Sequence, residues 1–337
     1  MSLDDAPLAP PPVDSLLLVG FGGPEGPQDV LPFLRNVTQG RDIPPDRLEE
    51  VSRHYLDVFG GVSPINHQCR ALQAALQEAM PELPVYWGNR NWHPLLPPVL
   101  QQMVDDGRRH ALAIVTSAFP SYSGCRQYRE DIARAQVAGA PVVTKLRHYY
   151  GEEGFLAPMR RNVLAAAAGL AAPRLVFTAH SLPLASAQTA GPSGGAYVEA
   201  LRLAAAAIAG DQEWDLVYQS RSGPPTVPWL EPDVSDHLIA LQAGGVREVV
   251  LVPVGFTSDH VEVLYDLDVQ ARATADRLGL VMRRAKTVGT HPEFVAMLAG
   301  LVRERIAAPR ELSSHGWVAT HDRCPAGCCP AGRRPAG

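Results

Sequence analysis

The chain has 337 residues, more than one hydrophobic core usually holds, so two domains are expected. Its composition, 46% hydrophobic and 19% charged residues, is typical of a globular protein, and a formal net charge of -5 argues against a nucleic-acid-binding surface. No apolar run in the sequence approaches the roughly 20 residues that a membrane-spanning helix needs. The acidic, proline-rich N-terminal segment does not resemble a secretory signal, so we expect a cytoplasmic protein.

Short apolar runs of strand length alternate with longer helical stretches along the chain. The runs are nearly continuous in Val, Leu and Ile, which is typical of strands buried on both faces of a parallel sheet. The helical stretches include 68–80 and 196–209. The predicted strands form two series of four, at 15–21, 84–88, 111–117 and 141–146, and then at 174–180, 214–220, 248–254 and 279–284.

This alternation favours an α/β architecture of two Rossmann-like domains, each built on a four-stranded parallel sheet. The domains are predicted at 15–170 and 171–308, with their boundary in the alanine-rich stretch 165–173. A flexible N-terminal segment, 1–14, precedes them, and a cysteine-rich tail, 309–337, follows. Ligands of such sheets bind beyond the carboxyl ends of the strands, so polar residues at those ends are the candidates for function.

Titratable side chains gather after the seventh predicted strand. Glu262, Asp266 and Gln270 recur every four residues and so share one face of the helix expected there. Carboxylates in such a row can pass a hard cation or protons along a line, whereas the simpler interpretation is a solvated helix face. His180 ends the fifth strand, as a proton acceptor, a metal ligand or a structural histidine. Because both strand ends belong to one predicted sheet, these groups are expected to face one site.

The segment after the first strand, 20–27, is rich in glycine. It lacks the Lys-Ser/Thr pair of a phosphate-binding P-loop, and its glycines do not have the spacing of a dinucleotide-binding fingerprint. Pro24 and Pro27 also remove amides that a phosphate would need. We therefore expect no nucleotide site here.

Six motifs give a more specific signal. FGGPEGPQDVLPFLRNV, FGGVSPIN, YSGCRQY, FTAHSLP, YQSRSGPPTVPWLEPD and PVGFTSDHVEVLYDLD occur in this order, and together they resemble the ferrochelatase family over nearly the whole chain. The resemblance implies a lyase of haem biosynthesis that inserts Fe²⁺ into a porphyrin, in a cleft between two Rossmann-type domains. Similarity to one bacterial branch favours coproporphyrin III over protoporphyrin IX. A cobalt or sirohydrochlorin chelatase and a non-catalytic haem-binding or iron-sulfur sensor protein are less favoured alternatives.

By motif, the resemblance assigns His180 and Glu262 to the metal site that faces the macrocycle, with Asp266 beside them to conduct ions or protons. Whether His180 accepts pyrrole protons or holds the iron is left open. Distorting the bound ring would expose the nitrogen lone pairs to the metal, with the strain drawn from binding of the ring's periphery. The partners expected are the porphyrin and ferrous iron, and a monomer is the default.

The resemblance also implies that Ser63, Tyr128 and, more weakly, Tyr55 contact the porphyrin, with Ser63 donating to a propionate. A turn or core role is the alternative for each. Two positions depart from the family pattern. Phe21 stands where some bacterial members have a tyrosine that approaches the iron axially, and Gln270 stands where other members carry glutamate.

The five cysteines are unevenly distributed, with three of them in the last fourteen residues. Four thiolates make the ligand set of a [2Fe-2S] cluster or of a structural zinc. Resemblance to the cluster-bearing branch favours a [2Fe-2S] cluster on Cys125, Cys324, Cys328 and Cys329. The alternative is a Pro/Gly/Ala-rich tail with incidental thiols. Cys69, in a helical stretch, is expected to be an ordinary buried residue.

Overall fold

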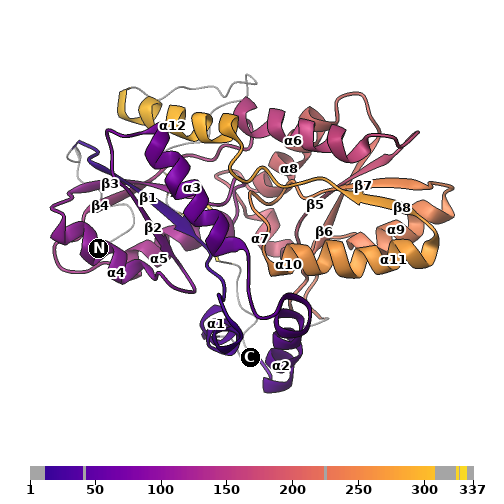
Figure 1. Ribbon diagram of the computed structural model, residues 1–337, viewed down its shortest axis with the longest axis horizontal. Coiled ribbons are helices and arrows are strands. Elements are labelled where there is room, and N and C mark those ends of the chain that lie inside the picture. The colour runs from indigo at the N-terminus through magenta and orange to yellow at the C-terminus, as the bar shows by residue number, and fades with distance from the viewer. Residues whose placement is uncertain (1–11, 41–42, 224–225, 308–323, 326, 332–337) are drawn as a thin grey trace.

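Two four-stranded parallel sheets organise the chain, one in each half (Figure 1). The computed structural model describes residues 12–40, 43–223, 226–307, 324–325 and 327–331. The first sheet has the strand order β2-β1-β3-β4, and the second repeats that pattern as β6-β5-β7-β8. Every pairing is parallel, which confirms the predicted α/β fold of two Rossmann-like parallel sheets.

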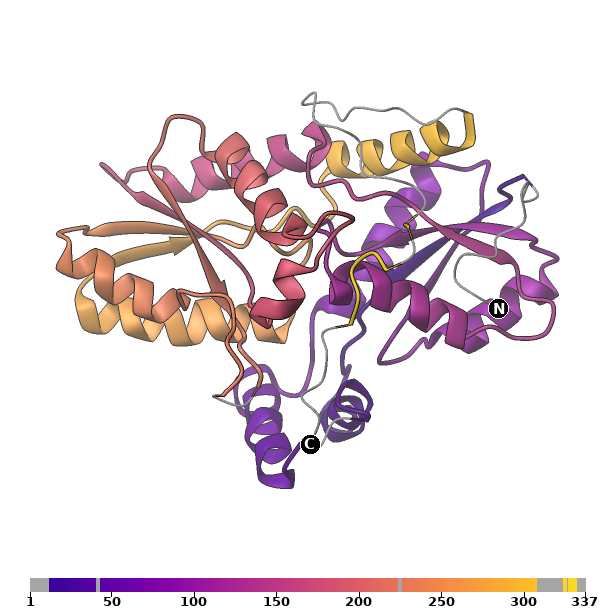
Figure 2. The same ribbon diagram turned by 180° about the vertical axis from the view of Figure 1, so that it is seen from behind.

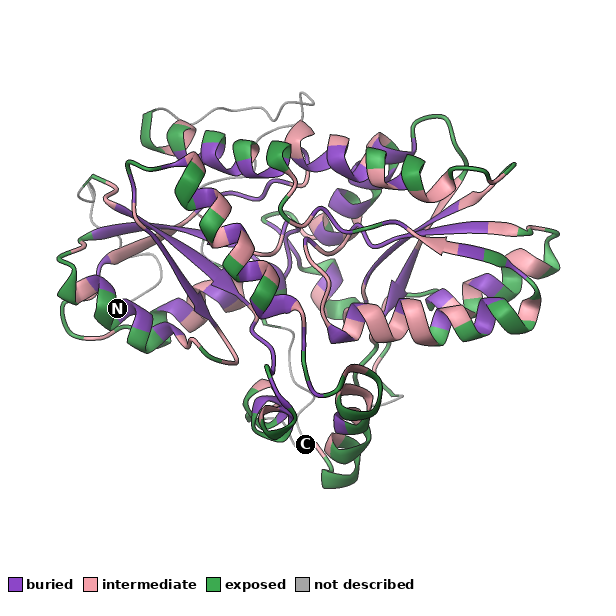
Figure 3. Cartoon of the chain, in the orientation of Figure 1, coloured by how far each residue is buried: buried purple, intermediate pink, exposed green. Residues whose placement is uncertain are grey.

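All eight predicted strands are present, each within two residues of its predicted limits. Figure 3 shows why the apolar runs predicted them, since the strands are buried while the outer faces of the helices are exposed. The strands are β1 (Ser15–Gly20), β2 (Val85–Asn89), β3 (His110–Val115), β4 (Val142–Lys145), β5 (Arg174–His180), β6 (Trp214–Gln219), β7 (Glu248–Val252) and β8 (Val281–Arg284).

The α-helices include both of the predicted stretches, 68–80 as α3 and 196–209 as α8. They are α1 (Val30–Val37), α2 (Pro45–Arg53), α3 (Ile65–Ala79), α4 (Leu96–Asp105), α5 (Gln127–Arg134), α6 (Glu153–Ala167), α7 (Leu184–Gln188), α8 (Ala196–Ala209), α9 (Val234–Ala243), α10 (Val261–Leu264), α11 (Arg272–Leu278) and α12 (Pro292–Ala307). A short 3₁₀ turn, η1 (Pro27–Asp29), and three π-helical segments, η2 (His54–Val58), η3 (Tyr122–Arg126) and η4 (Tyr265–Ala271), complete the described elements.

One continuous hydrophobic core runs through both halves of the molecule. It contains Leu16 of β1 and Phe177 of β5. The rings of Phe155 and Phe294 also pack in this core, with their centroids 6.3 Å apart. α1, α2 and η2 form an arm that projects away from both sheets in Figure 1. The arm has a small separate core centred on Phe33. The two sheets thus share one core, whereas the arm packs through a smaller cluster in which Phe33 contacts Phe21 and Trp92 of the first half.

The last described helix connects the second sheet back to the first half. α12 packs against α3 and α6, and Arg303 of α12 donates to the carbonyl oxygen of Ala79 at the end of α3 (2.9 Å). Arg147 is buried between two carboxylates, Glu152 at 2.8 Å and Glu304 of α12 at 3.3 Å. Among the described residues, no helix is long and apolar enough to span a membrane.

Candidate active site

The carboxyl ends of β5, β6 and β7 bring the candidate residues of the second sheet together. His180 is the last residue of β5 and pairs in register with Gln219 at the end of β6. Gly255, just after β7, runs so close to β5 that a Cβ on it would lie 2.7 Å from the Cα of Ala179. Because glycine alone allows this approach, the chain crosses beside the end of β5 and places Glu262, in α10, next to His180.

His180 and Glu262 form an ion pair. The His180 Nε2 lies 3.4 Å from the Glu262 Oε1, and the two side chains remain 34% and 41% exposed. Burial favours the neutral imidazole, but the charge of Glu262 outweighs it and raises the pKa of His180 to about 9. Burial also opposes the charge on Glu262, yet His180 holds the pKa of Glu262 at about 2. At neutral pH the pair is therefore an imidazolium and a carboxylate.

The backbone on either side of His180 is fixed by hydrogen bonds. The Tyr197 hydroxyl donates to the carbonyl oxygen of His180 at 2.8 Å. The amide of Ser181 donates to the carbonyl oxygen of Gln219, and the hydroxyl of Ser181 donates to that of Leu230, each at 2.8 Å. The imidazole is thus presented from a rigid strand end.

Asp266 lies on the same helical segment as Glu262 and is held by two residues at the end of β6. Gln219 Nε2 donates to Asp266 Oδ2 at 3.3 Å, and the Ser220 hydroxyl donates to the same oxygen. Burial, followed by the charge of Glu262, raises the pKa of Asp266 to about 7. Asp266 can therefore gain and lose a proton near neutral pH, beside an ion pair that keeps its charges.

Ser220 connects the two carboxylates. Its hydroxyl donates to Asp266, and the same hydroxyl contributes to lowering the pKa of Glu262. Ser220 has a φ of 63°, in the left-handed region where a non-glycine residue is strained. Backbone strain of this kind concentrates at functional sites, where surrounding contacts enforce it.

The helix that carries Glu262 changes its winding after one turn. α10 ends at Leu264 and the π-helical segment η4 follows, with the Asp266 side chain in its first turn. The wider turn of a π-helix keeps residues four apart on roughly one side, and such segments are frequent at functional sites. Gln270, the last member of the predicted row, is exposed at the outer end.

The arm reaches this helix through aromatic contacts. The ring of His54 stacks on that of Tyr265 at 3.9 Å, so the π-helical segments η2 and η4 meet. Tyr55 packs against Phe33 at 5.9 Å. Burial raises the pKa of Tyr55, and the nearby charges of Glu262 and Asp266 add to the effect. Tyr55 is thus close to the carboxylates, as a substrate-contacting residue would have to be.

Ser63 and Tyr128 belong to the first half. Ser63 is buried. A Cβ on Gly23 would lie 2.8 Å from the Cβ of Ser63, so only glycine at position 23 lets the glycine-rich segment pack this closely against Ser63. Tyr128 of α5 is also buried, with the Arg90 guanidinium 4.4 Å above its ring. Arg90 also lies 5.8 Å from the ring of Phe21, the residue that stands in the tyrosine position. The substrate roles of Ser63 and Tyr128 stay predictions.

Pairwise contacts connect Cys125 and the three cysteines of the tail. Sγ of Cys328 lies 3.9 Å from Sγ of Cys329. A hydrogen bond to Cys324, followed by burial, raises the pKa of the Cys125 thiol. Burial, Cys329 and Cys324 raise the pKa of Cys328 to about 12. Cys69 is buried in the main core, apart from this group.

Both halves of the molecule hold the tail cysteines. Arg126, in η3, donates from Nε to the carbonyl oxygen of Cys328 at 2.7 Å, and the amide of Gly191 donates to Sγ of Cys329 at 3.1 Å. Figure 2 shows this segment, in yellow, running between the two halves. Within the described ranges, no three His, Cys, Asp or Glu side chains are grouped in a way that could hold a metal ion. A cavity of about 470 Å³ lies elsewhere, against α12, and is lined in part by Met297 and Leu301.

The sequence interpretation missed several residues around His180. Ser220 and Gln219 were not singled out, although they follow the same rule that picked His180, since they stand at the carboxyl end of a strand in the same sheet. Tyr197, which holds the His180 carbonyl, lies in α8 and carries no such signal.

Comparisons with known proteins agree with this architecture. A model of the ferrochelatase family matches residues 13–306. The chain belongs to the ferrochelatase family. It is 51% identical to the coproporphyrin III ferrochelatases of Streptomyces griseus subsp. griseus and Streptomyces coelicolor, in each case over 96% of this chain and over 94% and 96% of those proteins. A ferrochelatase from Rhodopirellula baltica is 48% identical, over 95% of this chain and 94% of that protein.

Solved structures of chelatases share the fold. SirB from Bacillus subtilis with Fe³⁺ aligns with a TM-score of 0.55 at 12% identity, covering 88% of this chain and 96% of that one. The sirohydrochlorin chelatase SirB from Bacillus subtilis subspecies spizizenii, in complex with cobalt, gives a TM-score of 0.52 at 12% identity, covering 92% of this chain and 100% of that one. Ferrochelatases are lyases that insert ferrous iron into a porphyrin, so this member is an enzyme of haem biosynthesis.

Proposed function

We propose that the protein inserts ferrous iron into coproporphyrin III to give iron-coproporphyrin III. Identity of 51% to coproporphyrin III ferrochelatases, over nearly their full length, supports this porphyrin. The assignment of the site rests on one observation, the His180–Glu262 ion pair at the strand ends with the Asp266 carboxyl near it.

In this proposal His180 and Glu262 receive the ferrous ion. The carboxylate of Glu262 attracts the dication, and an ion that approaches within bonding distance displaces the proton of His180 to solvent, which the 34% exposed side chain contacts, so both side chains become available as ligands. Two pyrrole protons must also leave the ring, one after the other, and each needs an acceptor and a way out to solvent. Asp266, with a pKa of about 7, is suited to accept the two protons in succession and to release each of them to solvent on the side of the exposed Gln270 before it accepts the next.

In the same proposal, residues of the first half and of the arm contact the periphery of the porphyrin. Tyr55 is favoured by its closeness to Glu262, since a ring over the metal site would lie within reach of both. Ser63 offers a hydroxyl at the start of α3, where the positive end of the helix dipole favours a propionate. For Tyr128 the support is its motif alone.

We further propose that Cys125, Cys324, Cys328 and Cys329 hold a [2Fe-2S] cluster. The contacts of Cys328 with Cys329 and of Cys125 with Cys324 support these four thiols as the residues that would hold it. A structural zinc ion is the alternative for the same four thiols. The N–H donation from Gly191 to Cys329 is the kind of contact that stabilises a thiolate ligand. Because metallation of a porphyrin transfers no electrons, the cluster would serve structure or sensing.

The proposal places the enzyme in the cytoplasm as a monomer. None of the five cysteines, all of which the structure describes, forms a disulfide, which suits a reducing compartment. Light scattering of the intact protein after size-exclusion chromatography tests the oligomeric state.

Anaerobic insertion of Fe²⁺ tests the proposed reaction. Free-base coproporphyrin III and protoporphyrin IX are supplied in parallel, and the loss of their fluorescence is followed. We expect fast turnover with coproporphyrin III and much slower turnover with protoporphyrin IX. A preference for protoporphyrin IX would keep the reaction and overturn the substrate, and insertion into neither would overturn the proposal.

A further inference from the structure

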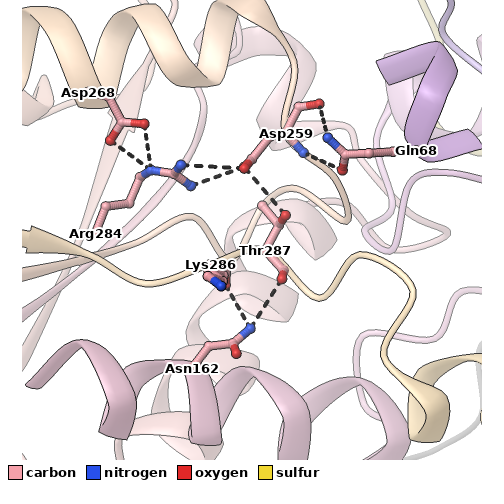
Figure 4. Close-up of polar contacts among 7 residues, drawn as sticks. All are labelled: Gln68, Asn162, Asp259, Asp268, Arg284, Lys286 and Thr287. Carbon is pink, nitrogen blue, oxygen red and sulfur yellow. Dashed lines mark hydrogen bonds and ion pairs between the residues drawn. The ribbon is translucent and has the colours of Figure 1, made fainter. Parts of the chain in front are cut away.

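The segment that leads to Glu262 is tied to the first half of the molecule. Gln68 of α3 donates from Nε2 to the carbonyl oxygen of Asp259 at 3.0 Å and accepts from the amide of Asp259 at 3.1 Å (Figure 4). Two residues earlier, the Thr257 hydroxyl donates to the carbonyl oxygen of Thr116, just after β3, at 3.2 Å. Three hydrogen bonds from the first half therefore converge on residues 257–259.

The same segment is held from the second half by charged and polar side chains. Arg284, at the end of β8, bonds Asp259 at 3.0 Å and Asp268 of η4 at 2.8 Å. Thr287 donates to the Asp259 carboxylate at 3.4 Å, and Asn162 of α6 donates to the carbonyl oxygen of Thr287 at 3.1 Å. Figure 4 shows these contacts as one chain from Gln68 to Asp268. Glu262, which lies between Asp259 and Asp268, is thus braced on both sides.

We propose that Gln68 is a positioning residue for metal insertion, fixing Glu262 relative to the porphyrin held by the first half. This rests on the proposed function, in which Ser63 binds the porphyrin and Glu262 receives the iron. Ser63 and Gln68 are five residues apart at the start of α3, and Asp259 is three residues before Glu262. Gln68 therefore links the segment of the proposed substrate contact Ser63 directly to the segment that leads to Glu262.

The chemistry of the side chain fits this role. A primary amide carries a donor and an acceptor on one rigid plane, so its two bonds to the Asp259 backbone fix both the distance and the rotation of that segment. A glutamate could only accept, and a methionine would fill the space with neither bond. Misplacing a reacting group by about 1 Å can cost about a hundredfold in rate, so loss of this link should act on the chemical step.

The experiment compares Gln68→Met with Gln73→Met in the full-length holoprotein. Gln73 is a matched control because it lies on the same helix and donates one hydrogen bond to a backbone carbonyl oxygen, that of Val85 at 2.8 Å, within its own half. We expect Gln68→Met to lower kcat for iron insertion about ten- to a hundredfold. Its Kd for free-base coproporphyrin III should stay within about twofold of the parent value, because the Ser63 segment is untouched. Gln73→Met should keep the parent kcat.

Hydrogen exchange gives a second readout that needs no activity. The Asp259 amide is protected by Gln68 Oε1, so exchange in residues 256–264 should be faster in Gln68→Met and unchanged in Gln73→Met. Parent-like exchange in Gln68→Met, a parent-like kcat, or an equal loss of kcat in both variants would each overturn the inference. A His180→Ala variant that still turns over would overturn the proposed metal site instead, and that failure is distinguishable because the exchange result does not depend on it.

Discussion

Replacing Ser220 by glycine removes the hydroxyl between two carboxylates without obstructing the backbone. Glycine adopts the φ of 63° found at this position more readily than serine does. The hydroxyl donates to Asp266, and its presence lowers the pKa of both Asp266 and Glu262. Its loss therefore raises the pKa of both groups, with Asp266 the one that titrates near neutral pH.

The size of the effect follows from the strength of one hydrogen bond to a charged group, about 1.5–3 kcal/mol. Since one pKa unit corresponds to about 1.4 kcal/mol and the hydroxyl is shared by two carboxylates, Asp266 should shift upward by about one unit. If the ionised Asp266 accepts a pyrrole proton, activity rises with pH through its pKa. The acid limb of the kcat–pH profile should then move about one unit to higher pH.

Ser220→Ala is the control for backbone strain. It lacks the hydroxyl as well, but it keeps a Cβ in the left-handed conformation, which costs about 1–2 kcal/mol. Both variants should show the same shift of the kcat–pH profile, whereas denaturant unfolding should find the alanine variant less stable than the glycine variant. Profiles of both variants that superimpose on that of the parent would refute the proposed relay through Asp266.

Three further outcomes can be checked. His180→Ala should lower kcat by about 10²- to 10⁴-fold while fluorescence titration still detects coproporphyrin binding, and parent-like turnover would remove His180 from the mechanism. Asp266→Asn should gain stability relative to the parent as pH rises from about 4 to about 7 in urea titrations, and the difference should then level off. The reason is that in this range the carboxyl is ionised in the unfolded chain but still protonated in the folded protein, so the parent loses stability as pH rises. A stability difference that does not change with pH would contradict the raised pKa of Asp266. Cys328→Ser should abolish the visible absorbance of a [2Fe-2S] cluster, whereas Cys69→Ser should retain it. A parent protein that carries zinc and no iron would contradict the cluster.

Much of the fold follows from local sequence pattern. The strands could be predicted because strands buried on both faces need almost uninterrupted apolar runs, as in Leu16–Val19. The place of His180 followed from its strand end. The π-helical winding of η4 has no comparable signal, since the aromatic stacking of Tyr265 on His54 accompanies it across a long sequence separation. The Gln68–Asp259 link joins residues 191 apart, so it depends on how the two halves pack and not on either local sequence.

The continuous core has a consequence for how a flat, rigid macrocycle reaches and leaves the enzyme. Moving the two sheets apart as jaws would expose packed side chains such as Leu16 and Phe177, at a cost comparable to partial unfolding. The arm holds only a small cluster of buried residues around Phe33, so displacing the arm costs less free energy than separating the sheets. We therefore expect the arm to move when the macrocycle enters and leaves, while the two sheets stay fixed relative to each other.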